Sequence, residues 1–223
     1  MEFSHIPVLL DECIEGLNIR PDGIYVDGTA GGAGHSSAIA ARLGAGGRLI
    51  AIDRDPDAVA VASERLSVYP NAQVIHSNYS QMRDVLDDLG IDKVDGILMD
   101  LGVSSYQLDE ESRGFSYHSD APLDMRMSKE GMSAADVVNT YSESEIARIL
   151  FEYGEEKFSR RIASNIIRER EKAPIETTLQ LADIVRNRKV NSSVSFFLQS
   201  AVAALPPAPL MATRLPLIQV GVP

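Results

Sequence analysis

The sequence predicts an α/β fold in which a Rossmann-like parallel sheet is followed by a helical segment. Four short apolar runs alternate with helix-like stretches in the first half of the chain. A dense glycine turn, from Gly28 to Gly34, comes directly after the first run. From Asp109 onward the alternation stops and helical patterns dominate. Alternating strands and helices are typical of parallel sheets with right-handed crossovers, and the later change predicts a separate helical domain.

The elements of the expected sheet follow one another at short intervals. Strands are expected at residues 24–26, 49–52, 73–76 and 96–99, with helices between them at residues 36–43, 56–66 and 82–86. The helix over 56–66 has the clearest start, because Asp55 can cap it and Pro56 suits its first turn. Residues 1–108 are therefore expected to form a Rossmann-like core domain.

The second half of the chain combines a loop, several helices and a tail. Residues 109–132 are polar and contain Gly and Pro, so a loop is expected there. Helices are expected from Ser133 to about residue 171 and over 177–185, which makes residues 109–186 a helical domain. Residues 191–223 hold five prolines and no acidic residue, and we expect the tail over 187–223 to be poorly ordered.

Composition excludes several classes of protein. The chain has 223 residues, 44% of them hydrophobic and 24% charged, as in ordinary globular proteins. No charge-free apolar run is long enough to cross a bilayer, and the first residues do not resemble a signal peptide. Cys13 is the single cysteine, which excludes an internal disulfide and a multi-cysteine metal site. We expect a cytoplasmic protein that binds no metal and no membrane.

The charge is distributed unevenly along the chain. The formal net charge is −11, but residues 1–156 carry 11 basic and 28 acidic side chains, whereas residues 157–223 carry 10 and 4. The two parts therefore differ in sign, with net charges of −17 and +6. Any surface that binds phosphate groups is expected mainly in the second part.

The glycine turn predicts a nucleoside-binding site. Glycines let the backbone turn sharply and approach a ligand closely, as at the phosphate loop of dinucleotide-binding proteins. Here the glycines do not fall in the dinucleotide spacing, and Asp27 precedes them. A carboxylate suits a cationic amino group such as that of S-adenosylmethionine. An NAD-dependent oxidoreductase on a similar sheet is the alternative.

Three further residues follow the ends of expected strands, where an open α/β sheet forms its binding crevice. Asp53 follows the second strand and can accept both ribose hydroxyls. Tyr79 follows the third and can stack on a base. Asp100 follows the fourth, beside the expected reacting centre, where a carboxylate can orient an amino group or accept its proton. Asp100 is therefore the candidate catalytic residue.

Several stretches together resemble the family of bacterial 16S ribosomal RNA cytosine-N4 methyltransferases (the RsmH or MraW family). The resemblance covers residues 1 to about 186. The matching stretches are His5–Leu10, Asp27–His35, Ala51–Asp55, Asp100–Ser105, Gln107–Asp109, Arg113–Ser116 and Pro122–Met127.

The resemblance implies a class I methyltransferase sheet that uses S-adenosylmethionine. Cofactor contacts are implied for Ala33, Gly34, His35, Asp53, Tyr79, Asp100 and Gln107, with Tyr79 standing where the family usually has Phe. The implied substrate is the N4 amine of a decoding-centre cytosine in 16S rRNA of the small ribosomal subunit. The helical domain looks like the family's inserted substrate-recognition domain.

The chain departs from the family after about Arg186. Two segments typical of the family, and the last strands that they lead to, are not found in the sequence. The departure suggests a truncated or frame-shifted product with an incomplete sheet and weak or absent methyl transfer. A non-catalytic RNA-binding or ribosome-assembly module is a further alternative, because the second part of the chain is basic.

Overall fold

The computed structural model describes residue 7 and residues 9–186. Within them, helices alternate with four parallel strands and then give way to helices alone. The strands are β1 (Ile24–Asp27), β2 (Arg48–Asp53), β3 (Ala72–His76) and β4 (Gly96–Leu98). The helices of the sheet lobe are α1 (Leu10–Leu17), α2 (Gly34–Ala40), α3 (Pro56–Leu66), the 3₁₀ turn η1 (Tyr79–Gln81) and α4 (Met82–Asp88). The predicted α/β fold with a parallel sheet is confirmed.

The strand order is β3-β2-β1-β4, so the chain reverses direction across the sheet after β3. Val26 in β1 lies between Ile50 of β2 and Ile97 of β4 in the register. A ligand crevice is expected at such a reversal, beyond the carboxyl ends of the central strands. β1 and β2 end there on Asp27 and Asp53, and Asp100 follows the end of β4 by two residues.

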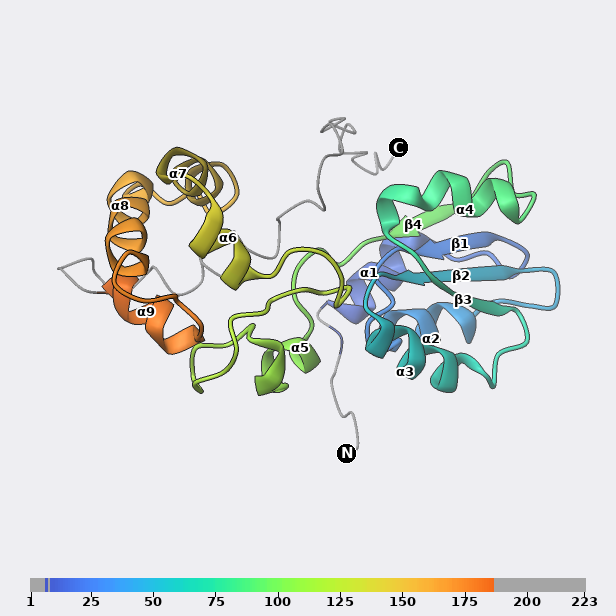
Figure 1. Cartoon of the computed structure of the whole chain (residues 1–223). Coiled ribbons are helices and arrows are strands. Elements are labelled where there is room, and N and C mark those ends of the chain that lie inside the picture. The colour runs from blue at the N-terminus through green and yellow to red at the C-terminus, as the bar shows by residue number, and fades with distance from the viewer. Residues whose placement is uncertain (1–6, 8, 187–223) are drawn as a thin grey trace.

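Apolar side chains of the strands divide between the two faces of the sheet. Leu49 and Ala51 face a core that includes residues of α1, α2 and α3. Val26, Ile50 and Ile52 face a second core that includes Leu86 of α4. Figure 1 shows α4 on one side of the sheet and α2 and α3 on the other. Burial on both faces explains why the strands read as continuous apolar runs in the sequence.

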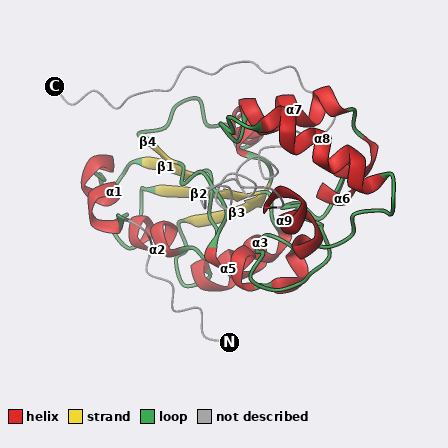
Figure 2. Cartoon of the chain, turned by 90° about the vertical axis from the view of Figure 1, so that its left-hand side faces the viewer, coloured by secondary structure: helices red, strands yellow, loops and turns green. Residues whose placement is uncertain are grey.

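The helical lobe follows β4. It contains α5 (Ser105–Asp109), the 3₁₀ turn η2 (Glu111–Arg113), α6 (Ala134–Thr140), α7 (Glu143–Glu152), α8 (Ser159–Arg170) and α9 (Thr178–Arg186). Its own apolar core is built around side chains such as Phe115, Ile162 and Ile166. Capping boxes start α6 at Ser133 and α7 at Ser142. Figures 1 and 2 show α6–α9 gathered to one side of the sheet.

The structure differs from the sequence predictions in several local details. α2 begins at Gly34 rather than residue 36, and the segment expected to be loop begins with the end of α5 and contains η2. α1 was not predicted, because Leu9 precedes it in a left-handed conformation and provides no side-chain cap. Val103 and Leu108 pack against the helical core, although both lie within the expected core domain. The expected tail over 187–223 lies outside the described residues.

In the part of the chain that the structure describes, no helix combines the length and apolar character needed to span a membrane. The same residues contain no cluster of three or more His, Cys, Asp or Glu side chains arranged to hold a metal ion.

Candidate active site

The glycine loop after β1 turns tightly and leads directly into α2. Gly31 has φ +50°, in the left-handed region that favours glycine, and Ala33 also has a positive φ of 60°. Space is tight at Gly34, because a Cβ there would lie 2.3 Å from Cγ of Pro7. The loop therefore depends on glycine for conformation at Gly31 and for close packing at Gly34.

Asp27 stabilises this loop from inside. It is buried, and its carboxylate accepts hydrogen bonds from Ser36 Oγ at 2.6 Å and from the Thr29 backbone N–H at 3.0 Å. Burial raises the pKa of Asp27 above its ordinary value, against the opposing effect of those two hydrogen bonds. Asp27 thus organises the turn, instead of presenting its carboxylate openly to a ligand amine as its position in the sequence suggests.

Asp53 joins the end of β2 to the glycine loop. Its Oδ2 accepts from the Gly31 backbone N–H at 2.8 Å, and its Oδ1 accepts from the Asp55 backbone N–H at 2.9 Å. Burial raises the pKa of the Asp53 carboxyl. Each carboxylate oxygen has more than one acceptor site, so capacity remains for the two hydroxyls of a ribose.

Apolar side chains lie beside the start of the glycine loop. A Cβ built on Gly28 would lie 3.1–3.3 Å from side-chain atoms of Met99, Met82 and Tyr79. Tyr79 and Met99 are large apolar side chains that remain 41% and 49% exposed. Together they offer a flat aromatic ring and a polarisable thioether to a planar base. Sequence reasoning identified Tyr79 and missed Met99.

Asp100 is exposed beyond the end of β4. Its backbone N–H donates to Thr29 Oγ1 at 2.7 Å, which ties this segment to the loop after β1. The pKa of Cys13 in α1 is raised by burial and then by the charges of Asp100, Glu12 and Asp27. The influence of both aspartates places the Cys13 thiol near the ends of β1 and β4.

Gln107 contacts Asp55, the residue whose backbone N–H binds the Asp53 carboxylate. It is buried in α5, its Nε2 donates to Asp55 Oδ2 at 2.7 Å, and its Oε1 accepts from the Ser104 backbone N–H at 3.0 Å. His35 is buried in the first turn of α2. Burial raises the pKa of Asp27, and the nearby His35 opposes that rise. The structure therefore brings Ala33, Gly34, Asp53, Tyr79 and Asp100 to one edge of the sheet and sets Gln107 against the start of α3.

These residues fit an adenosyl ligand that carries an amino acid group. The half-exposed ring of Tyr79 suits a base, and the half-buried carboxylate of Asp53 suits a ribose diol. The exposed carboxylate of Asp100 suits an ammonium group. Gly31, with its left-handed backbone, leaves room for close approach to the loop.

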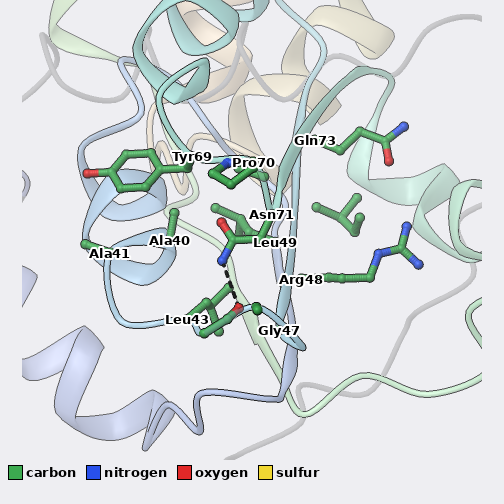
Figure 3. A pocket seen from close by; sticks show the side chains of 14 residues that line it. Ala40, Ala41, Leu43, Gly47, Arg48, Leu49, Tyr69, Pro70, Asn71 and Gln73 are labelled. Carbon is green, nitrogen blue, oxygen red and sulfur yellow. Dashed lines mark hydrogen bonds between the residues drawn. The ribbon is translucent and has the colours of Figure 1, made fainter.

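A separate hollow of about 720 Å³ lies at the opposite end of the sheet (Figure 3). It is lined by residues that lead into β2 and β3, including Arg48, Tyr69 and Asn71. The Asn71 side chain donates to the Gly44 carbonyl across this hollow at 3.3 Å. Because it lies at the amino ends of the strands, the hollow is remote from the candidate site.

Comparison with known sequences decides the family. Residues 2–197 match the sequence profile of the MraW methylase family. The chain belongs to this family. Among its relatives, the ribosomal RNA small subunit methyltransferase H of Lachnospira eligens is 58% identical over 188 residues, and that of Brevibacillus brevis is 55% identical over 188 residues. Each alignment covers 83% of this chain and 60% of the relative. This MraW-family chain thus spans about 60% of the length of these curated relatives.

Solved structures give weaker matches. An rRNA methylase from Streptococcus thermophilus has a TM-score of 0.30 at 22% identity, covering 38% of this chain and 50% of that protein. A SAM-dependent methyltransferase from Aquifex aeolicus has a TM-score of 0.34 at 17% identity, covering 63% and 76%. TM-scores this low do not establish a shared structure, so the assignment to the MraW family rests on sequence.

Two residues of the site region had no role in the sequence predictions. Thr29 connects the loops after β1 and β4, and Arg113 binds the start of α3 from the helical lobe. Arg113 lies in one of the stretches that resemble the family, but its partner is far away in the chain. A sequence pattern contains no signal for that pairing, since the two residues belong to different lobes.

Proposed function

We propose that this chain binds S-adenosylmethionine at the carboxyl edge of its sheet and serves methyl transfer to the N4 amine of a cytosine in 16S rRNA. The observation that carries the proposal is the arrangement of Asp53, Tyr79 and Asp100 around the glycine loop in a MraW-family chain. The relatives' names as small-subunit rRNA methyltransferases support the substrate class. Such a substrate places the protein in the bacterial cytoplasm.

The cofactor roles follow from the contacts of each residue. Asp53 holds the ribose hydroxyls, while the amides of Gly31 and Asp55 fix its carboxylate in place. Tyr79 and Met99 contact the adenine. Ala33, Gly34 and His35 shape the loop around the amino acid part. Gln107 acts through Asp55, because its Nε2 donates to that buried carboxylate at 2.7 Å.

The bound cofactor supplies an electrophilic methyl group. The cytosine amine is a poor nucleophile, because its lone pair is delocalised into the ring. A hydrogen-bond acceptor such as the Asp100 carboxylate orients the amine and takes up the proton that it loses. Much of the rate then comes from alignment of the amine with the methyl group. We assign recognition of the surrounding RNA to the helical domain over 109–186.

Titration calorimetry with S-adenosylmethionine, followed by methyl transfer to small subunits that lack the modification, tests this function. We expect saturable binding of S-adenosylmethionine, with no competition from NAD⁺. We also expect the transferred methyl label at the N4 of a cytosine in 16S rRNA. A full-length relative serves as the positive control, because this chain spans 60% of the relatives' length. Binding of NAD⁺ alone would contradict the cofactor assignment. Label on another base would contradict the proposed substrate.

Affinity for S-adenosylmethionine is expected to depend on pH through Asp53. Burial raises the pKa of this carboxyl, and its ionised form is the better acceptor for ribose hydroxyls. Binding therefore favours the ionised form, and affinity falls by up to about tenfold per pH unit as the pH drops below that raised pKa. Calorimetry across the acidic range measures the slope.

Asp53→Asn provides the control for this slope, since the amide does not titrate. A slope that persists in the variant would assign the titration to another group. The stability of the free protein changes with pH in the opposite direction. Carboxyls with a raised folded pKa, Asp27 and Asp53, make the folded state less stable as pH rises from 3.8 through that folded pKa.

The alternative functions have less support. The glycine spacing and the match to the MraW family both disfavour an NAD-dependent oxidoreductase. A non-catalytic RNA-binding module would bind rRNA with a steep salt dependence and give no turnover in the presence of S-adenosylmethionine. The methyl-transfer assay described above measures that turnover.

A further inference from the structure

A buried ion pair joins the two lobes at the start of α3. Asp55 is the N-cap of α3, and its side chain is only 1% exposed. The Arg113 side chain, from η2 in the helical lobe, is 7% exposed and lies 3.0 Å from Asp55 Oδ2. Gln107 donates to the same carboxylate oxygen at 2.7 Å. Two side chains of the helical lobe thus converge on one buried carboxylate of the sheet lobe.

Both terminal nitrogens of Arg113 make further hydrogen bonds. One terminal nitrogen donates to Asp57 Oδ2 at 3.0 Å, and the other donates to the carbonyls of Arg126 and Met127 at 3.0 Å each. The Arg113 carbonyl accepts from the backbone N–H of Met125, a buried residue with φ 60°. A buried charge is tolerated when it is paired and hydrogen-bonded, and the terminal nitrogens of Arg113 are both.

The same carboxylates lead directly to the glycine loop. The Asp55 backbone N–H donates to Asp53 Oδ1, and the other Asp53 oxygen accepts from the Gly31 N–H. From the body of α3, Arg65 donates to the Gly32 carbonyl at 2.6 Å. The glycine loop is therefore held at two successive residues, at Gly31 by Asp53 of β2 and at Gly32 by Arg65 of α3. Arg113 in turn holds the first turn of α3.

We propose that Arg113 is a positioning residue that couples the glycine loop to the helical lobe through Asp55. Arg113, Asp55, Asp57 and Gln107 form what we call the latch. The latch fixes the start of α3, which fixes the Asp53 carboxylate and, through it, the Gly31 amide. The identity of the ligand at that loop rests on the function proposed above, but the coupling itself does not.

The test compares Arg113→Met with Lys129→Met in the whole chain. Both substitutions remove one positive charge next to Asp57, but Lys129 contacts only the exposed side of that carboxylate, at 2.7 Å. We expect Arg113→Met to weaken S-adenosylmethionine binding roughly 10- to 100-fold, within the usual range for coupled sites. Lys129→Met is expected to stay within about twofold. Arg113→Lys, which keeps the charge without the planar fork, should be intermediate.

Hydrogen exchange in the ligand-free protein tests the coupling independently of the ligand. Amide exchange at Gly31 is expected to accelerate about tenfold or more in Arg113→Met, and exchange at Ile162 in the helical core to stay unchanged. If wild type does not bind S-adenosylmethionine but Gly31 exchange responds in this way, the proposed function fails and the latch stands. Unchanged Gly31 exchange in a folded Arg113→Met variant would overturn the latch.

A double variant covers the case in which Arg113→Met does not fold. Removing both charges with Asp55→Asn and Arg113→Met avoids an unpaired buried carboxylate, and such replacements are often neutral for stability. The double variant is expected to fold and still to show faster exchange at Gly31. Wild-type exchange in this folded double variant would also overturn the proposal.

Discussion

Replacing Asp53 with Ala is expected to weaken S-adenosylmethionine binding roughly 100- to 10,000-fold. In the proposed site, the substitution removes the charged acceptor of two hydrogen bonds that the ribose hydroxyls donate, each worth about 1.5–3 kcal/mol. It also frees the Gly31 and Asp55 amides that this carboxylate now holds at 2.8 and 2.9 Å. Titration calorimetry of the folded variant measures the change.

Asp92→Ala is the matched control for Asp53→Ala. Asp92 is exposed, and its substitution changes the net charge by the same amount. Its affinity for S-adenosylmethionine is expected to equal that of wild type. A similar loss in both variants would assign the effect to overall charge, and undiminished binding by Asp53→Ala would remove Asp53 from the site.

Gly114→Ala is expected to destabilise the chain by roughly 3 kcal/mol. Gly114 has φ +70°, and a Cβ there would lie 2.3 Å from the Pro122 carbonyl oxygen and 3.0 Å from the Asp124 nitrogen. These are backbone atoms, so relief requires movement of the loop. The estimate combines a left-handed penalty of about 1 kcal/mol with an overpacking cost of about 1–3 kcal/mol. Urea unfolding followed by circular dichroism measures it.

Gly131→Ala separates backbone conformation from packing. Gly131 has φ +78°, similar to Gly114, but no heavy atom lies within 4 Å of its Cβ position. The variant should therefore lose only about 1 kcal/mol. Equal losses at the two glycines would contradict the packing argument for Gly114.

The sheet was predictable because its physical signals are local. Burial on both faces makes β1 and β2 short apolar runs, and Asp55 followed by Pro56 starts α3 as expected. The position of Asp53 at the end of β2 follows from the same reasoning. Whether Asp53 binds ribose is not contained in the fold and stays a prediction. The α1 helix lacked a side-chain cap, so no local pattern indicated its start.

Contacts between distant parts of the chain were not predictable. Asp27 looks like a ligand residue in the sequence, but burial and the Ser36 hydroxyl direct its carboxylate into the turn. Gln107 is implied as a cofactor contact by resemblance, which stays a prediction, but the bonds of its amide to Asp55 and to the Ser104 amide could not be foreseen. Both outcomes depend on which polar groups meet after folding, and sequence spacing does not encode that.

The two cores on the sheet and the core of the helical lobe are built from separate parts of the chain. Members of the cores on the sheet lie within residues 10–94, and members of the helical core lie within residues 103–185. Each core therefore closes within its own part of the chain. During synthesis, the sheet segment leaves the ribosome before the helical segment does. Arg113 can reach Asp55 only afterwards, which makes the joining of the two lobes a late step in maturation of the chain.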